Sequence, residues 1–306
     1  MTNLNYTDWT WLDTNDTGAE WRIVVDKNFI LDNPANLWQN RTNIPILQGT
    51  NKDEYSMFEL LNLLLNVSGS NSVSDYNEAK LKSAFEPLFT QYLGQNVDEV
   101  FKIVENVYLP SNMAANDSLA WFKAYSDVFT GAYFTATTSK EIDNWLWNNN
   151  TQVYLYQFTY PSKLGLWYPT PGWNPVPHSS EVYLIWMQEY IWNSSILYGT
   201  ISQTDYAMAN FFGQTWTDFA KNIMPNSTLG WTPTSLDDHN YYDIGYVSKN
   251  RDAYRREDVI LWNKVIPKLA GNSQTPTQTT TQACNNAVNI KISIYSAMSI
   301  GLILLL

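Results

Sequence analysis

VYLYQFTY, at residues 153–160, is the strongest strand signal in the chain. Its side chains alternate along the run and are rich in aromatic rings, a pattern that favours the extended backbone of a sheet. Upstream, residues 44–48 form a short apolar run closed by Gly49, which is typical of a buried strand. Residues 22–31 predict a short strand and turn, and residues 241–247 predict an edge strand.

Amphipathic or aromatic-rich segments lie between and after these strands. They predict helices at residues 55–65, 75–89, 96–108, 117–137, 204–222 and 255–269. Strands that alternate with helices indicate an α/β fold. The 306 residues are 44% apolar and 15% charged, which is enough to build a core and argues against disorder. The net charge of −11 argues against nucleic acid as a partner.

Two ionisable residues follow the predicted strands and can work together. Glu54 ends the segment IPILQGTNKDE, and His178, one of two histidines, lies in PVPHSSE at residues 175–181. An imidazole activates a serine hydroxyl by removing its proton, and a carboxylate holds that imidazole in the useful tautomer. Acid before histidine is the chain order of the α/β-hydrolase triad. The alternative is a solvent-facing glutamate at a strand end and a loop histidine packed among prolines.

Five segments in order resemble the C-terminal half of a type-B carboxylesterase, the cholinesterase/carboxylesterase family. They are VVD at 24–26 with Phe29, Asp32 and Pro34; IPILQGTNKDE; PVPHSSEVYLIW; residues 207–226 with Trp216, Phe219, Ala220, Pro225 and Asn226; and residues 252–269 with LWN and PKL. The resemblance covers roughly residues 20–270. It implies the C-terminal part of an α/β-hydrolase fold, with a mostly parallel sheet flanked by helices. It also implies that Glu54 is the triad acid and His178 the triad base, with Glu181 as a weaker supporting residue.

The nucleophile elbow of this fold reads G-x-S-x-G, and no such pentapeptide occurs in the 306 residues. We therefore expect a serine outside this chain, an N-terminal half that is missing, and no ester hydrolysis by the chain alone. The resemblance implies a small carboxylic ester as substrate of a longer parent protein. The alternative is a catalytically silent adhesion or receptor relative of the neuroligin kind. There is no Gly-rich phosphate loop and no Cys/His cluster with metal-ligand spacing, so neither a cofactor nor a metal is expected.

The sequence also predicts a secreted, anchored protein. Eight N-x-Ser/Thr sequons favour the secretory pathway; their asparagines are Asn5, Asn15, Asn40, Asn66, Asn116, Asn149, Asn193 and Asn226. Residues 271–287 predict a Thr/Gln-rich stalk with an attachment region, beyond a domain at 1–270. The apolar tail at 288–306 fits a GPI signal, with a membrane tail helix as the alternative. Such a protein would face the cell exterior. Residues 1–20 lack the features of a signal peptide, so we expect that they are not the native start.

Two features concern self-association. Cys284 is the single cysteine, so no intrachain disulfide forms. It could link two chains near the anchor, or it could be removed with the tail. The helix predicted at 255–269 could join a homodimer interface, as the resemblance implies, or its apolar face could pack on its own domain.

Overall fold

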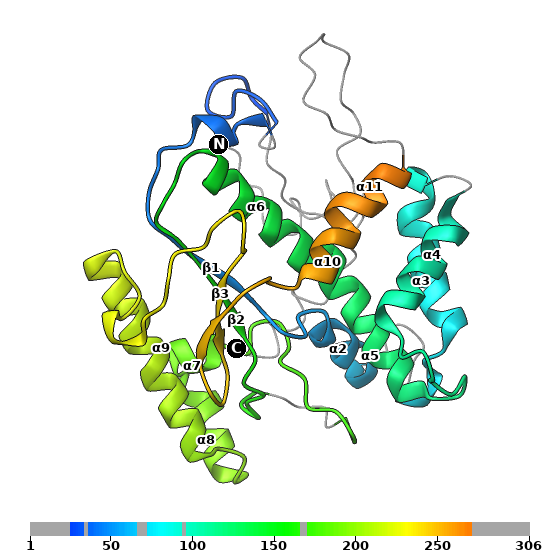
Figure 1. Ribbon diagram of the computed structural model, residues 1–306. Coiled ribbons are helices and arrows are strands. Elements are labelled where there is room, and N and C mark those ends of the chain that lie inside the picture. The colour runs from blue at the N-terminus through cyan, green and yellow to red at the C-terminus, as the bar shows by residue number, and fades with distance from the viewer. Residues whose placement is uncertain (1–24, 34–35, 66–71, 94–95, 166–169, 271–306) are drawn as a thin grey trace, which may run out of the picture.

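A computed structural model of the protein describes residues 25–33, 36–65, 72–93, 96–165 and 170–270. Within these residues, four strands form one sheet in the order β1-β2-β3-β4. The strands β1 (Ile46–Asn51), β2 (Val153–Phe158) and β3 (Tyr241–Ile244) are parallel, and β4 (Lys249–Arg251) runs antiparallel to β3. Helices lie on both sides of the sheet (Figure 1), which confirms the predicted α/β fold.

The strand β2 is buried along its whole length because helices cover both of its faces. Tyr156 and Phe158 pack toward α9 (Gln203–Asn222), and the Phe158 ring lies 5.2 Å from that of Phe212. Leu155 packs on the opposite face with Ile142 of α6 (Ala136–Trp147). Parallel strands covered on both faces are apolar nearly throughout, which explains why this segment gave the strongest strand signal.

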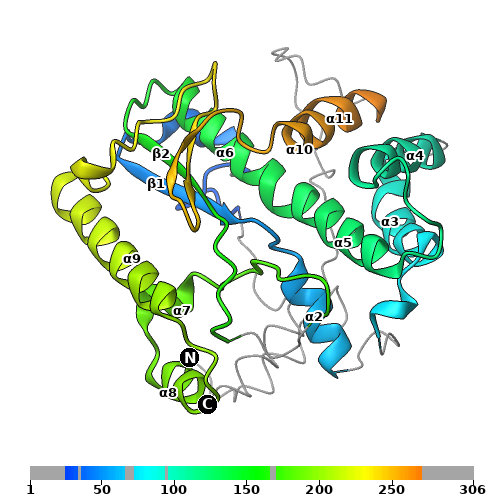
Figure 2. The same ribbon diagram turned by 60° about the horizontal axis from the view of Figure 1, so that its bottom comes forward.

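The helices form two groups beside the sheet (Figures 1 and 2). One group holds α7 (Val182–Trp186), α8 (Glu189–Leu197) and α9. The other group holds α2 (Ser56–Leu65), α3 (Glu78–Leu93), α4 (Val97–Tyr108), α5 (Ser118–Phe129), α6, α10 (Arg256–Ile260) and α11 (Ile266–Leu269). Short 3-10 helices are η2 (Trp38–Asn40), η3 (Val73–Asp75) and η6 (Ser227–Leu229).

Two of the longer helices contain a π-helical turn. The turn η5 (Thr130–Thr135) joins α5 to α6, and η7 (Leu261–Val265) joins α10 to α11. The first of these helices begins where Asp117 Oδ1 accepts a hydrogen bond of 3.0 Å from the backbone N–H of Ala120. The sequence predicted this start, but it placed the end at residue 137, whereas the helix continues to Trp147.

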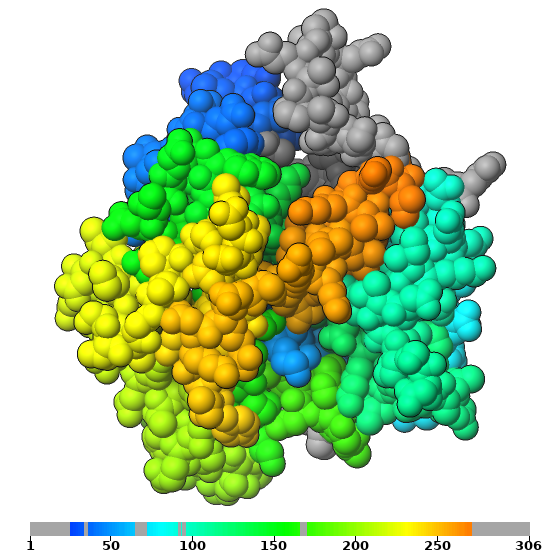
Figure 3. All heavy atoms as spheres, viewed as in Figure 1, coloured from blue at the N-terminus to red at the C-terminus, as the bar shows by residue number. Residues whose placement is uncertain are grey.

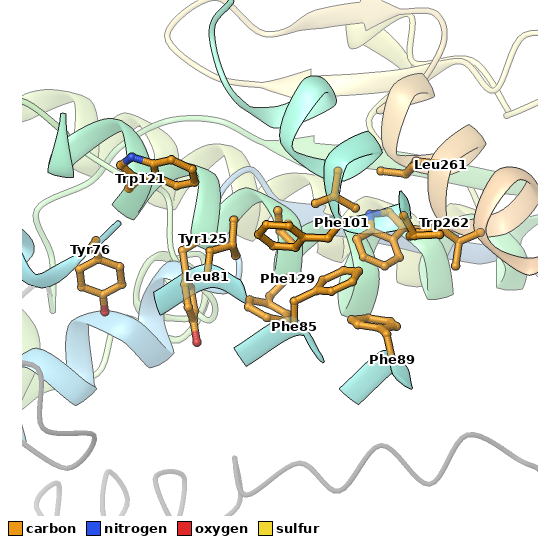
Figure 4. Packing of buried hydrophobic residues seen from close by; sticks show 14 of the residues in the cluster. Tyr76, Leu81, Phe85, Phe89, Phe101, Trp121, Tyr125, Phe129, Leu261 and Trp262 are labelled. Atoms are coloured by element: carbon orange, nitrogen blue, oxygen red, sulfur yellow. The ribbon is translucent and has the colours of Figure 1, made fainter. Parts of the chain in front are cut away.

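The largest core is aromatic and lies between α3, α4, α5 and η7 (Figure 4). Phe85 and Phe89 stack at 4.4 Å, and Phe89 lies 5.4 Å from Trp262. Trp262 and Ile266 of the last helix pack into this core, so the apolar face of that helix is buried against other parts of the same chain. Asn96 Nδ2 also donates to Leu269 O at 3.2 Å, and the helix lies against the surface of α4 (Figure 3).

One local prediction was wrong, and two short helices were not predicted. The predicted edge strand ends at Ile244 and lies between β2 and β4, so β4 is the edge instead. A short strand and turn were predicted at residues 22–31; the described residues 25–31 hold the turn, in which Asp26 Oδ1 accepts three backbone N–H groups. The short helices α7 and α8 follow His178 where no element was predicted.

Several predicted features lie outside the described residues. They are the stalk and tail at 271–306, with Cys284, and the sequons at Asn5, Asn15 and Asn66. Of the sequons in the described part, Asn226 is half-buried, and the exposed ones are Asn40, Asn116, Asn149 and Asn193. No helix among the described residues is both long enough and apolar enough to cross a membrane.

Candidate active site

Glu54 and His178 come together at the carboxyl ends of β1 and β2. Glu54 lies in the turn between β1 and α2, and His178 ends the long connection that follows β2. Glu54 Oε2 lies 2.7 Å from His178 Nδ1, although 124 residues separate the two in sequence. Ligands of α/β proteins bind at the carboxyl ends of the parallel strands, so the pair lies at the edge where chemistry is expected.

The two loops that carry the pair are joined by backbone hydrogen bonds. Asp53 N donates to Val176 O at 3.0 Å, and Val176 N donates to the carboxylate of Asp53 at 2.8 Å. His178 N donates to Glu54 O at 3.1 Å. Burial raises the pKa of Asp53, and the hydrogen bond from Val176 acts in the opposite direction. These contacts fix the distance between the two loops before any side chain of the pair is considered.

Both carboxylate oxygens of Glu54 are engaged. Oε1 accepts a hydrogen bond of 2.7 Å from the backbone N–H of Asn51, while Oε2 meets the imidazole. The Glu54 side chain is only 7% exposed, whereas that of His178 is 32% exposed. Within the described residues, Nε2 of His178 makes no hydrogen bond. The contact at Nδ1 favours the tautomer that carries its proton there, which leaves a lone pair on Nε2.

Two phenylalanines flank the imidazole. The ring of Phe58, from α2, stacks on His178 at 5.9 Å, and that of Phe134, from η5, lies 5.2 Å away at 46°. The π-helical turn is tied to the acid loop, because Tyr55 N donates to Thr130 Oγ1 at 3.0 Å. The imidazole is therefore packed between two apolar rings, and its hydrogen bond to Glu54 is made at Nδ1.

The charges around the imidazole favour its protonated form. Burial lowers the pKa of His178, but the hydrogen bond and charge of Glu54, with a smaller effect of Glu181, outweigh burial and raise the pKa above its ordinary value of 6.5. Burial also raises the pKa of Glu181, and the neighbouring charge of Glu54 adds to that rise. The site thus stabilises the imidazolium that forms when a base accepts a proton.

Glu181 is near the pair without bonding to the imidazole. Its Oε2 accepts a hydrogen bond from Asn51 Nδ2, and that same amide also bonds to Pro177 O at 2.7 Å. Asn51, Ser180 and Phe134 are site residues that sequence reasoning missed. The place of Asn51, three residues before Glu54 in IPILQGTNKDE, was the available signal for the first of them.

The other histidine is also paired. His239 Nε2 lies 2.7 Å from Asp143 Oδ1 of α6, just before the amino end of β3. Among the described residues, no group of three or more His, Cys, Asp or Glu side chains could hold a metal ion.

Sequence comparison relates the chain to known proteins. A sequence model of the carboxylesterase family matches residues 1–262. Human bile salt-activated lipase is 23% identical over 226 residues, which cover 73% of this chain and 28% of the human protein. The bovine protein of the same name is 23% identical over 228 residues, which cover 72% of this chain and 36% of the bovine one. The chain thus spans about a third of the length of these curated relatives.

Proposed function

The chain belongs to the carboxylesterase family, and on that premise we propose that Glu54 and His178 are the acid and base of a serine carboxylic-ester hydrolase. The observation that carries the proposal is the pair itself. A buried, doubly hydrogen-bonded carboxylate meets Nδ1 of a partly exposed imidazole, and Nε2 has no hydrogen-bond partner among the described residues.

Each residue has a role in this scheme. His178 Nε2 takes the proton of the serine hydroxyl as its oxygen attacks the ester carbonyl, and it then gives that proton to the departing alcohol. Water repeats the cycle on the acyl-enzyme and releases the acid. Glu54 keeps its charge throughout and stabilises the imidazolium, which agrees with the raised pKa of His178.

The serine lies, in this proposal, on a part of the protein that the 306 residues do not include. These residues hold no G-x-S-x-G pentapeptide, and they span about a third of the length of relatives named as lipases. We propose carboxylic esters as the substrate class on the strength of the family and of those names. A silent relative would need neither Glu54 nor His178, so the intact pair favours an enzyme.

Covalent labelling tests the proposal. A fluorophosphonate probe, which reacts with activated serines, should label a longer product of the same gene and leave the 306-residue chain unlabelled. Mass spectrometry of the labelled peptide should place the serine N-terminal to the segments described here. His178→Gln in the longer product should abolish labelling, and Lys249→Gln, on the exposed edge strand, is the control. Labelling that survives loss of His178, or a longer product with no reactive serine, would contradict the proposal and support the silent relative.

A further inference from the structure

We propose that Asn51 is the positioning residue of the Glu54–His178 pair, an inference that rests on the function proposed above. Asn51 is the last residue of β1, where it pairs in register with Phe158 of β2. Its place is therefore fixed by the sheet, and its side chain is 1% exposed. From that place it bonds to both loops of the pair.

The backbone of Asn51 orients the acid. Its N–H donates to Glu54 Oε1 at 2.7 Å, three residues further along the chain. With Oε1 held there, Oε2 is turned toward the imidazole. The backbone contact is available to any residue except proline, so it does not by itself explain an asparagine at this position.

The amide of Asn51 holds the loop of the base. Nδ2 donates to Pro177 O at 2.7 Å, directly before His178. It also lies 3.3 Å from Ser180 Oγ and within hydrogen-bond distance of Glu181 Oε2. Acceptors therefore lie on both sides of the histidine along the chain, and one amide group ties them to the end of β1.

The acceptors around position 51 require a side chain with two N–H donors, which an amide provides. Nδ2 carries two hydrogens, which suit a carbonyl on one side and a hydroxyl and carboxylate on the other. Aspartate has no such donor and would add a negative charge beside Glu54 and Glu181. The Oδ1 atom of Asn51 is buried and has no hydrogen-bond partner within the described residues. A buried polar atom without a partner is costly, so the amide is retained here for its donors.

Loss of the Asn51 amide should lower the pKa of His178 through two effects. Without Nδ2 the carbonyl of Pro177 loses its partner, so the contact between Nδ1 and Glu54 becomes less well aligned. Glu181 also loses the hydrogen bond that lowers its pKa, and it then carries less of the charge that raises the pKa of His178. Both effects lower the pKa of His178.

Nuclear magnetic resonance of the 306-residue chain tests the inference, because its two histidines give two assignable sets of signals. We expect Asn51→Ala to lower the pKa of His178 by on the order of one pH unit, the size of ordinary environmental shifts in proteins. The far-downfield Nδ1 proton signal of the pair should weaken or disappear. Asn51→Leu, which keeps the branch at Cγ and removes the donors, replaces this variant if Asn51→Ala does not fold.

Asn150→Ala is the matched control. Asn150 is also a buried asparagine at the end of this sheet, where its Nδ2 donates to Ile44 O at 2.7 Å and its Oδ1 accepts from Gln152 N at 2.9 Å. It lies before β2, at the amino end, away from the pair. Its loss should lower stability and leave the pKa and proton signal of His178 unchanged, so a general structural effect is separated from positioning.

The outcomes separate this inference from the proposed function. Glu54→Gln should abolish the downfield signal if the pair exists as described. If the wild-type chain shows no such signal and no raised pKa, the proposed function fails with the inference. If wild type and Glu54→Gln behave as expected but the Asn51 variants match wild type, or if Asn150→Ala shifts His178 equally, only the role of Asn51 is refuted.

Discussion

The His178–Glu54 and His239–Asp143 pairs lie at opposite ends of the sheet, and each joins a ring nitrogen to a carboxylate oxygen at 2.7 Å. The first pair uses Nδ1 and the second uses Nε2, and in each pair the other ring nitrogen has no hydrogen-bond partner among the described residues. Glu54 is 7% exposed and accepts a second hydrogen bond from Asn51 N, whereas Asp143 is 21% exposed and has no second donor among the described residues. An imidazole–carboxylate distance therefore does not identify a base. The support of the carboxylate and the ring nitrogen that is used distinguish the two pairs instead.

The largest difference between the pairs is expected in catalysis. In a longer product that hydrolyses a p-nitrophenyl ester, His178→Gln should lower kcat by a factor on the order of 10⁴ to 10⁶, because the serine then has no base. His239→Gln should leave kcat near its wild-type value. Steady-state kinetics at one pH compares the two variants. Similar losses for both would remove the functional distinction between the pairs.

The second difference concerns stability. Glu54→Gln replaces a buried acceptor of two hydrogen bonds, and should lower the free energy of unfolding by about 1–3 kcal/mol. Asp143→Asn should lower it by about 0–1 kcal/mol, as is usual for partly exposed ion pairs. Urea unfolding followed by tryptophan fluorescence measures both. The comparison is valid if the slope against urea is unchanged, and equal losses would contradict it.

The third difference is the pH dependence that His178 adds to stability. Its pKa is raised in the folded chain, so its contribution is fully present below the unfolded value of 6.5 and is lost as pH rises through the folded value. The difference in free energy of unfolding between wild type and His178→Gln should thus be largest in acid and decrease above pH 6.5. A series of urea titrations across this range measures it, with His239→Gln as the reference. A difference that increases with pH would reverse the sign and refute the raised pKa.

The smallest expected effect belongs to Glu181. Glu181→Gln removes a charge that raises the pKa of His178, so that pKa should fall by less than it does in Glu54→Gln. Histidine proton signals followed across a pH titration measure the shift, with His239 as the internal reference. A shift as large as that of Glu54→Gln would mean that Glu181, and not Glu54, is the main partner of the imidazole.

The sequence indicated the Glu54–His178 pair better than the residues that surround it. Glu54 and His178 were predicted as a pair from the resemblance and from the chain order of acid and histidine, and the parallel strands bring the two side chains to one edge of the sheet. Asn51 was not predicted, since its bonds to Pro177 and Glu181 depend on how a distant loop folds back. Phe134 depends on a π-helical turn, which a hydrophobic pattern does not reveal.

The fold was likewise predicted only where the sequence has an apolar pattern. The strands β1 and β2 were predicted from their apolar runs, as was the position of most helices; β2 is buried throughout, whereas β1 is half-buried until Thr50 and Asn51. The strand β4 reads KNR and is exposed at every residue, so it has no apolar pattern, and this explains why β3 was mistaken for the edge.

The π-helical turn η5 also changes which side of the continuous α5–α6 helix faces inward. Before the turn, the inward side of α5 carries Phe122 and Phe129 into the aromatic core, and after it the inward side of α6 carries Ile142 onto the sheet. A π turn holds one residue more than the α-helical turn that it replaces. Deleting a single residue between 130 and 135 would rotate one half against the other by about 100°, since 3.6 residues complete a turn. The extra residue of the π turn thus sets the rotation of α6 relative to α5, so that the side chains of each helix face their own core. The same residue places Phe134 beside the imidazole.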